Sequence, residues 1–214
     1  MVEITKVDPA KIESLSFKII EEEAGEHGLE AERWAIVRRL IHATADFDYL
    51  KQTRFHRQAV ESGIAAIKAG AAIVTDTRMA QAGITKTHLA PFGSEVHCFI
   101  NDKEVIAAAR AENITRAAAA VSRAREILDG GIAVIGNAPT ALIELVRLFQ
   151  RGEVRPALVV GMVVGFVNAA EAKELLMESG LVYITVAGRK GGSAVAAATV
   201  NALADLALKK TDKT

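Results

Sequence analysis

Short runs of apolar, often β-branched residues recur along the chain and predict strands. These runs cover residues 71–76, 95–100, 131–136, 157–164 and 181–188. Each run is mostly apolar instead of alternating, which is typical of strands covered by helices on both faces. Alanine-rich segments dotted with charges lie between them, and Gly130 and Gly180 mark expected helix ends. The alternation predicts an α/β fold with a parallel sheet of about five strands and right-handed crossovers.

The first 70 residues follow a different pattern and predict an N-terminal helical segment. Asp8 is suited to cap a first helix, with Pro9 just inside it. A second helix is expected from Glu30 to His42. Because no repeat, low-complexity tract or linker divides the sequence, we expect residues 1–214 to form a single domain.

The composition limits the classes of function. Lys plus Arg equal Asp plus Glu at 26 each, so no overall field favours nucleic acid or an acidic membrane surface. Any anion site must therefore be local. Cys98 is the single cysteine, and the N-terminus lacks the apolar core of a secretion signal, so we expect a cytoplasmic protein. The longest uncharged run, residues 156–170, is shorter than the ~20 apolar residues of a membrane helix.

The turn GRKGGS follows the last predicted strand, where ligands of parallel sheets bind. Gly188, Gly191 and Gly192 permit close backbone approach, and Arg189 and Lys190 add positive charge. The next helix would add free amides from its first turn, which favours an anion site. Neither the GxxxxGK[ST] nor the GxGxxG spacing is present. A glycine turn with solvated charges is the alternative interpretation.

The turn GNAPT and a basic segment are two further candidates for ligand binding. Pro139 suits the first position of a helix, and Asn137 could serve the turn or offer its amide to a ligand. From Arg33 to Arg57 there are six basic residues against two acidic ones, a local net charge of +4. That segment is either a solvated helix face or an anion-binding wall.

His42, in RRLIHATADFDYL, is the candidate acid or base. Histidine exists as both acid and base near neutral pH, although a structural role is the more common one for a single histidine. The five histidines and the cysteine show no metal-ligand spacing, and no GxSxG motif is present, so we predict no metal site and no serine nucleophile. The residues alone predict a doubly wound α/β protein with a local basic pocket for an anionic ligand.

Several motifs together resemble the precorrin-8X methylmutase family, also called precorrin isomerase. In order, they are SFKIIEEE, RRLIHATADFDY, VTDTRMAQAGI, ITRAAAA, VIGNAPTAL, ALVVGMVVGFVNAAEAK and GRKGGSAVAAATVNAL. The resemblance runs from about Pro9 to about Leu206. It implies a flavodoxin-like three-layer α/β/α fold and a homodimer. It also implies an enzyme of cobalamin biosynthesis that needs no cofactor. This enzyme moves a methyl group from carbon 11 to carbon 12 of precorrin-8X or cobalt-precorrin-8, giving hydrogenobyrinate or cobyrinate.

The resemblance also implies roles for individual residues. His42 matches the histidine assigned to proton transfer. The positions expected around the carboxylates of the corrin precursor are Ser16, Arg39, Thr85, Arg116, Asn137, Arg189, Lys190, Gly191 and Gly192. Two departures from the family pattern, Val163 in place of a proline and Ala117 in place of a serine, concern the shape of the substrate pocket.

Two other classes of function fit parts of the sequence. A non-catalytic corrinoid carrier would keep the carboxylate-binding groups without needing an acid or base at His42. A flavin or nucleotide phosphate-binding module would use the same fold and the GRKGGS turn. Ligand binding without turnover would identify the first, and a yellow protein or a nucleotide-dependent melting shift would identify the second.

Overall fold

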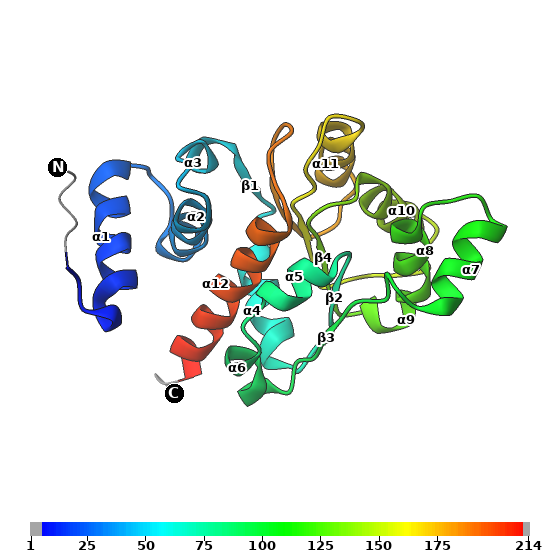
Figure 1. Cartoon of the computed structure of the whole chain (residues 1–214), viewed down its shortest axis with the longest axis horizontal. Helices are drawn as coiled ribbons and strands as arrows, with labels where there is room; N and C mark the ends of the chain where they lie inside the picture. The colour runs from blue at the N-terminus through cyan, green and yellow to red at the C-terminus, as the bar shows by residue number, and fades with distance from the viewer. Residues whose placement is uncertain (1–5, 212–214) are drawn as a thin grey trace.

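A mostly parallel sheet forms the centre of the protein (Figure 1). The structure is a computed structural model that describes residues 6–211. Across that range six strands are joined in the order β1-β6-β5-β4-β2-β3. Their bounds are β1 Thr53–Phe55, β2 Ile73–Thr75, β3 Val96–His97, β4 Ile132–Ile135, β5 Leu158–Gly161 and β6 Tyr183–Val186. Neighbours pair in parallel except β1, which pairs antiparallel with β6 through Thr53↔Val186 and Phe55↔Ile184.

Helices cover both faces of this sheet. The N-terminal ones are η1 Pro9–Lys11, α1 Ile12–Ala24, α2 Ala31–Thr44, α3 Asp48–Gln52 and α4 Ala59–Lys68. Those in the middle are α5 Arg78–Gly83, α6 Lys86–Leu89, η2 Ala90–Phe92, α7 Lys103–Ala111, α8 Arg116–Arg123 and α9 Arg125–Leu128. The C-terminal ones are α10 Pro139–Gln150, α11 Ala169–Glu178 and α12 Ser193–Thr211.

Strand β4 shows why the apolar runs do not alternate with polar residues. Ile132 and Val134 are buried against α2, α4 and α12, whereas Ala133 and Ile135 are buried against α10 and α11. Both faces of the strand therefore lie in a core, and a polar residue on either face would lose its contact with water. This arrangement confirms the predicted three-layer α/β/α fold, which Figure 1 shows with α1 and α2 at one end and α7 and α8 at the other.

The predicted strands and helix ends agree with the structure in most places. Each of the five apolar runs contains a strand. Asp8 accepts a hydrogen bond from the N–H of Ala10 at 3.1 Å, and the second helix begins one residue after Glu30. Gly130 and Gly180 have φ values of 72° and 83°, the left-handed backbone expected just beyond a helix.

Strand β1 contradicts the prediction that the first 70 residues are entirely helical. It contains three residues, one of them exposed, so it carries no apolar run that a pattern could detect. Its partner β6 lies far along the chain, and pairing with that distant strand makes Thr53–Phe55 extended. The sheet therefore has one strand more than the approximate count of five.

Along residues 6–211 the structure contains no helix that is both long enough and apolar enough to span a bilayer.

Candidate functional site

Four turns stand next to each other at the carboxyl ends of the parallel strands. The strand order places residues 187–192 after β6 beside residues 162–168 after β5, then residues 136–138 after β4 and residues 76–77 after β2. Ligands of open α/β sheets bind at this edge. The structure thus brings together, at this carboxyl edge of the sheet, the predicted residues Asn137, Arg189, Lys190, Gly191 and Gly192.

His42 lies in the last turn of α2 and is exposed. The ring of Phe17 from α1 meets the imidazole edge-on, with 5.2 Å between ring centroids. Ala45, with φ of 52°, ends the helix by donating its N–H to the carbonyl of Ile41 at 2.7 Å. The imidazole is therefore packed against Phe17 on one side and exposed on the other.

Ser16 and His42 line the same cavity, which has a volume of about 360 Å³. The other lining residues are mostly apolar and come from α1 and from the end of α2: Ile19, Ile20, Glu23, Ile41, Ala45 and Phe47. The hydroxyl of Ser16 donates to the carbonyl of Ile12 at 2.9 Å, so its oxygen keeps its capacity to accept a hydrogen bond. Two residues predicted from separate motifs thus meet in one hollow.

Lys190 is bound to two carboxylates that follow the His42 helix. Its Nζ lies 2.5 Å from Asp46 Oδ2 and 2.6 Å from Asp48 Oδ2. Hydrogen bonds to Asp46 and then Asp48 raise the pKa of Lys190, and the same bond to Lys190 is the main cause that lowers the pKa of Asp46. The positive charge that the sequence suggested for a substrate carboxylate is paired within the chain.

Lys173 is fully buried in α11 and was not recognised from the sequence. Its Nζ donates to the backbone carbonyl of Lys190 at 2.7 Å. Burial lowers the pKa of Lys173 to about 8, because desolvation disfavours its charged form. The helical spacing of apolar residues in α11 could have predicted its burial, since Lys173 shares the buried face with Ala169, Ala172 and Leu176.

Gly191 and Gly192 pack against the backbone that follows β5. A Cβ on Gly191, whose φ is 157°, would lie 2.3 Å from the carbonyl oxygen of Met162. The N–H of Gly192 donates to that same oxygen at 2.7 Å. Close backbone approach therefore explains Gly191, whereas Gly192 has space for a Cβ but a φ of 125° that favours glycine, and its amide already has a partner.

Asp76, directly after β2, holds the turn that contains Asn137. Its buried carboxylate accepts the backbone N–H groups of Gly136, Asn137 and Ala138 at 2.8 to 2.9 Å. Burial raises the pKa of Asp76, and these three hydrogen bonds oppose the shift. Of the two roles that the sequence left open for Asn137, the structure gives the support of the turn to Asp76, and the Asn137 side chain is exposed.

Helix α8, which begins with Arg116, lies at the other end of the molecule from α2, which carries His42 (Figure 1). It is exposed at the first residue of α8, where Thr115 caps the helix by accepting the N–H of Ala118. The hydroxyls of Thr115 and Thr140 share a hydrogen bond of 2.7 Å that joins the starts of α8 and α10. Arg116 is thereby held near the Asn137 turn, which immediately precedes α10.

Arg39 and Thr85 lie outside the cavity that contains His42. The guanidinium of Arg39 is paired with Glu13 at 2.5 Å and with Asp205 at 2.6 Å. The backbone N–H of Thr85 donates to Asn201 Oδ1 of α12 at 2.8 Å. A single chain therefore does not gather all the predicted substrate-binding residues around His42.

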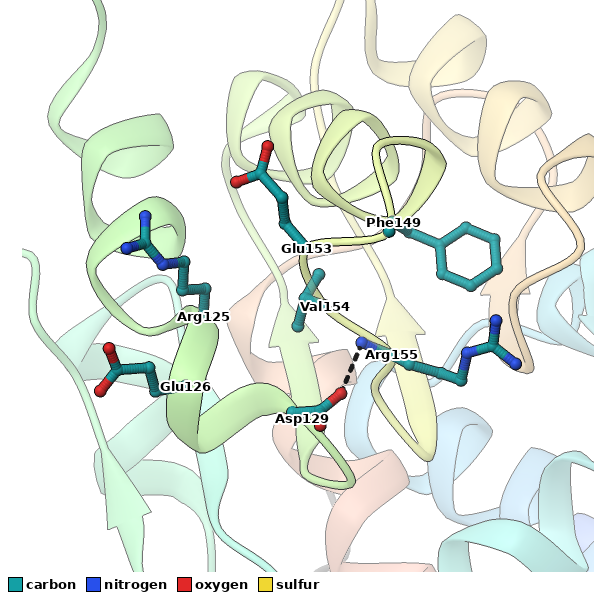
Figure 2. Close-up of a pocket in the computed structure, with 8 residues that line it drawn as sticks. Arg125, Glu126, Asp129, Phe149, Glu153, Val154 and Arg155 are labelled. Carbon is teal, nitrogen blue, oxygen red and sulfur yellow. Dashed lines mark hydrogen bonds between the residues drawn. The ribbon is translucent and has the colours of Figure 1, made fainter.

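A second cleft, of about 570 Å³, lies at the opposite edge of the sheet (Figure 2). Asp129 and Arg155, which line it, precede β4 and β5, and the carboxylate of Asp129 accepts the backbone N–H of Arg155 at 2.9 Å. Figure 2 shows the Arg155 side chain directed toward Phe149, whose ring lies 5.8 Å from its guanidinium carbon. Because this cleft is at the amino ends of the strands, it is separate from the candidate site.

A sequence model of the precorrin-8X methylmutase family matches residues 11–206. The chain belongs to this family. The cobalt-precorrin-8 methylmutase of Leptospira interrogans is 45% identical over 210 residues, covering 94% of this chain and 96% of the relative. The precorrin-8X methylmutase of Pseudomonas aeruginosa is 45% identical over 191 residues, covering 88% and 91%.

A solved structure of the precorrin-8X methylmutase from Thermus thermophilus superposes with a TM-score of 0.87 at 48% identity, covering 94% of this chain and 98% of that one. These findings confirm the family and the fold predicted from the motifs. Precorrin-8X methylmutases are isomerases of cobalamin biosynthesis, and this member of the family is an enzyme of that kind.

Proposed function

We propose that the chain moves a methyl group from carbon 11 to carbon 12 of precorrin-8X or cobalt-precorrin-8, with His42 transferring the proton. The observation that carries this proposal is the shared cavity of Ser16 and His42 in a chain that belongs to the methylmutase family. The imidazole is open to a ligand there, while the ring of Phe17 limits its movement.

The chemistry requires little more than a mobile proton and a fixed substrate. Moving a methyl group across a conjugated ring redistributes electrons and demands one tautomer of the macrocycle, which an acid and its conjugate base supply. No group is added or lost, so the protein has only to bind the ring and favour the geometry of migration. One histidine beside a largely apolar wall meets this need.

The carboxylates of the substrate need cations around that wall. Arg189 is exposed and lies over the ring of Phe166, with 5.5 Å between its guanidinium carbon and the ring centroid. Phe166 itself is 83% exposed, so an apolar surface and a cation stand together on the carboxyl edge. Arg116 and Asn137 add donors further along the same edge. We include Ser16, Arg39 and Thr85 among the contacts, as the family motifs predict.

We further propose that two copies of the chain complete the site. The cavity at His42 has room for an edge of a macrocycle, and Arg39, Thr85 and Arg116 lie outside it. Helix α1 beside that cavity presents the exposed apolar residues Ile12, Leu15 and Ile19, which suits a protein contact. Sedimentation at micromolar concentration should give about twice the chain mass of 22.8 kDa. A monomer throughout this range would contradict the proposal.

The proposed enzyme is cytoplasmic and consists of one domain over residues 1–214, with no nucleic acid or membrane partner. The balanced charge of the chain and a family match that spans residues 11–206 support this proposal.

Turnover of the two substrates tests the function. Precorrin-8X and cobalt-precorrin-8 are supplied separately, and the visible spectrum is followed for formation of hydrogenobyrinate or cobyrinate. We expect conversion of at least one of them without an added cofactor. Binding without conversion would favour a corrinoid carrier, and a nucleotide-dependent rise in melting temperature with no corrinoid binding would favour a phosphate-binding module.

A further inference from the structure

Lys190 joins the turn after β6 to the segment that follows the His42 helix. Its ammonium contacts the carboxylates of Asp46 and Asp48 at 2.5 and 2.6 Å, and its backbone carbonyl accepts from the buried Lys173 at 2.7 Å. The residue is therefore held at both ends, by α11 at its backbone and by the residues after α2 at its charge.

The contacts continue from the two aspartates back to the helix that carries His42. The N–H of Asp46 donates to Thr44 Oγ1 at 3.3 Å, and the hydroxyl of Thr44 donates to the carbonyl of Leu40 in α2 at 2.8 Å. Oδ1 of Asp46 accepts the N–H of Asp48 at 2.9 Å, which closes the turn. Hydrogen bonds thus connect Lys190 to the last turn of the His42 helix.

The turn that contains Lys190 is itself fixed to the middle of the sheet. Gly192 donates to Met162 at 2.7 Å, and the N–H of Gly165 donates to the carbonyl of Arg189 at 3.3 Å. Both contacts join this turn to the segment after β5, which carries the exposed Phe166. Through these contacts, the Lys190 ion pairs connect the end of the His42 helix to the segment after β5 that carries Phe166.

We propose that Lys190, Asp46 and Asp48 are positioning residues that hold His42 in register with the carboxyl edge, and that Lys190 does not bind a substrate carboxylate. This inference rests on the proposed function. A lysine that faces an anionic ligand must have its charge available, but here two internal carboxylates already bind it. Well-placed catalytic groups depend on such supporting contacts, since small displacements reduce the rate of a positioned reaction.

Lys190→Met and the double variant Asp46→Asn/Asp48→Asn distinguish positioning of His42 from binding of a substrate carboxylate. Each variant removes the ion pairs, the first by loss of the cation and the second by loss of the carboxylates. For positioning residues, both should lower kcat by about tenfold and leave the dissociation constant of the product within about twofold. The combined variant should be no worse than either, because all three share one interaction. If Lys190 instead binds substrate, Lys190→Met would raise the dissociation constant about tenfold or more, whereas the aspartate variant would leave it unchanged or lower it.

Arg151→Met is the matched control. Arg151 is also a half-exposed cation paired with two carboxylates, Glu144 and Glu153, but it follows α10, away from the carboxyl edge. This variant should keep both kcat and product affinity. Circular dichroism of every variant confirms that the fold is retained.

The NMR signal of the His42 ring gives a readout that does not require turnover. The Cε1–Hε1 signal should shift or broaden in Lys190→Met and in Asp46→Asn/Asp48→Asn, and should stay unchanged in Arg151→Met. Unchanged His42 signals in the first two variants would overturn the positioning role. If the His42 signals change in these two variants but the wild type converts neither substrate, the positioning role is retained and the proposed function is rejected.

Discussion

The carboxylate of Asp76 accepts the backbone N–H of Gly136 at 2.9 Å, which connects the end of β2 to the turn after β4. The same side chain accepts two further N–H groups of that turn. Three donors at the carboxyl edge thus depend on one buried side chain.

Asp76→Asn should lower the free energy of unfolding by about 2 to 4 kcal/mol, because one oxygen becomes an N–H₂ group that faces buried donors. Denaturation with urea measures the loss. Asp129→Asn is the control, since Asp129 is exposed and accepts one N–H, from Arg155, so a loss below about 1 kcal/mol is expected. Equal stability of Asp76→Asn and the wild type would mean that the turn does not depend on the carboxylate.

Lys173 should make the stability of the protein depend on pH in the alkaline range. Its pKa is about 8 in the folded chain and 10.5 as its ordinary value, so between these values the unfolded chain binds more protons. The free energy of unfolding therefore rises with pH across this window. This gain in stability is lost again as the pH falls to 8 and below. Relative to Lys173→Met, the wild type should gain up to about 3 kcal/mol between pH 8 and 10.5.

Urea titrations of the wild type and Lys173→Met at several pH values measure this difference. The difference in unfolding free energy should be constant below pH 7. A difference that stays constant up to pH 10.5 would contradict a buried lysine with a lowered pKa.

His42→Ala should reduce kcat by at least ~100-fold if proton transfer limits the rate, while the fold and the product affinity persist. Conversion of the corrin precursor followed in the visible spectrum gives the rate. His97→Ala serves as the control, because this histidine lies on the edge strand β3 and its loss should leave turnover unchanged. Near wild-type turnover in His42→Ala would remove His42 from the mechanism.

Arg116→Lys should raise the dissociation constant of hydrogenobyrinate or cobyrinate by about tenfold to hundredfold. Arginine can hold a carboxylate through two parallel hydrogen bonds, and lysine keeps the charge but not this geometry. The expected change follows from a charge-assisted bond of roughly 1.5 to 3 kcal/mol. Titration of the product measures it, with Arg123→Lys at the last residue of α8 as the control. Equal affinities would mean that Arg116 faces solvent.

Gly191→Ala should destabilise the chain by at least about 3 kcal/mol, because a Cβ would overlap the carbonyl oxygen of Met162. Gly188→Ala is the matched control in the same turn. At Gly188, φ is 75° but a Cβ would meet no atom within 4 Å, so only a backbone cost of about 1 kcal/mol is expected. Thermal unfolding of both variants separates steric overlap from backbone strain.

The apolar runs predicted the layers of this fold because both faces of the central strands are buried. The same reasoning missed β1, whose extended backbone depends on pairing with β6. It also did not single out Lys173, although the helical period placed this residue on the face of α11 that packs inward. In both cases a contact distant in sequence determined the local structure.

The candidate site was predicted in part. The motifs identified Ser16 and His42, which line one cavity. Asp76 and the ion pairs of Lys190 were missed, since each joins segments that the sequence separates widely. These contacts form because the strands lie in the order β6-β5-β4-β2 in the sheet, and this order cannot be read from their order along the chain.

Because β1 pairs with β6, a segment made early in translation depends on one made late. The helix that carries His42 is made early, but β6 and α12, to which its segment is bound, follow residue 182. During synthesis the helix that carries His42 therefore lacks β6 and α12 until the last part of the chain has emerged, and domains fold as units. The end of α2 that carries His42 reaches its final position only when nearly the whole polypeptide has been translated.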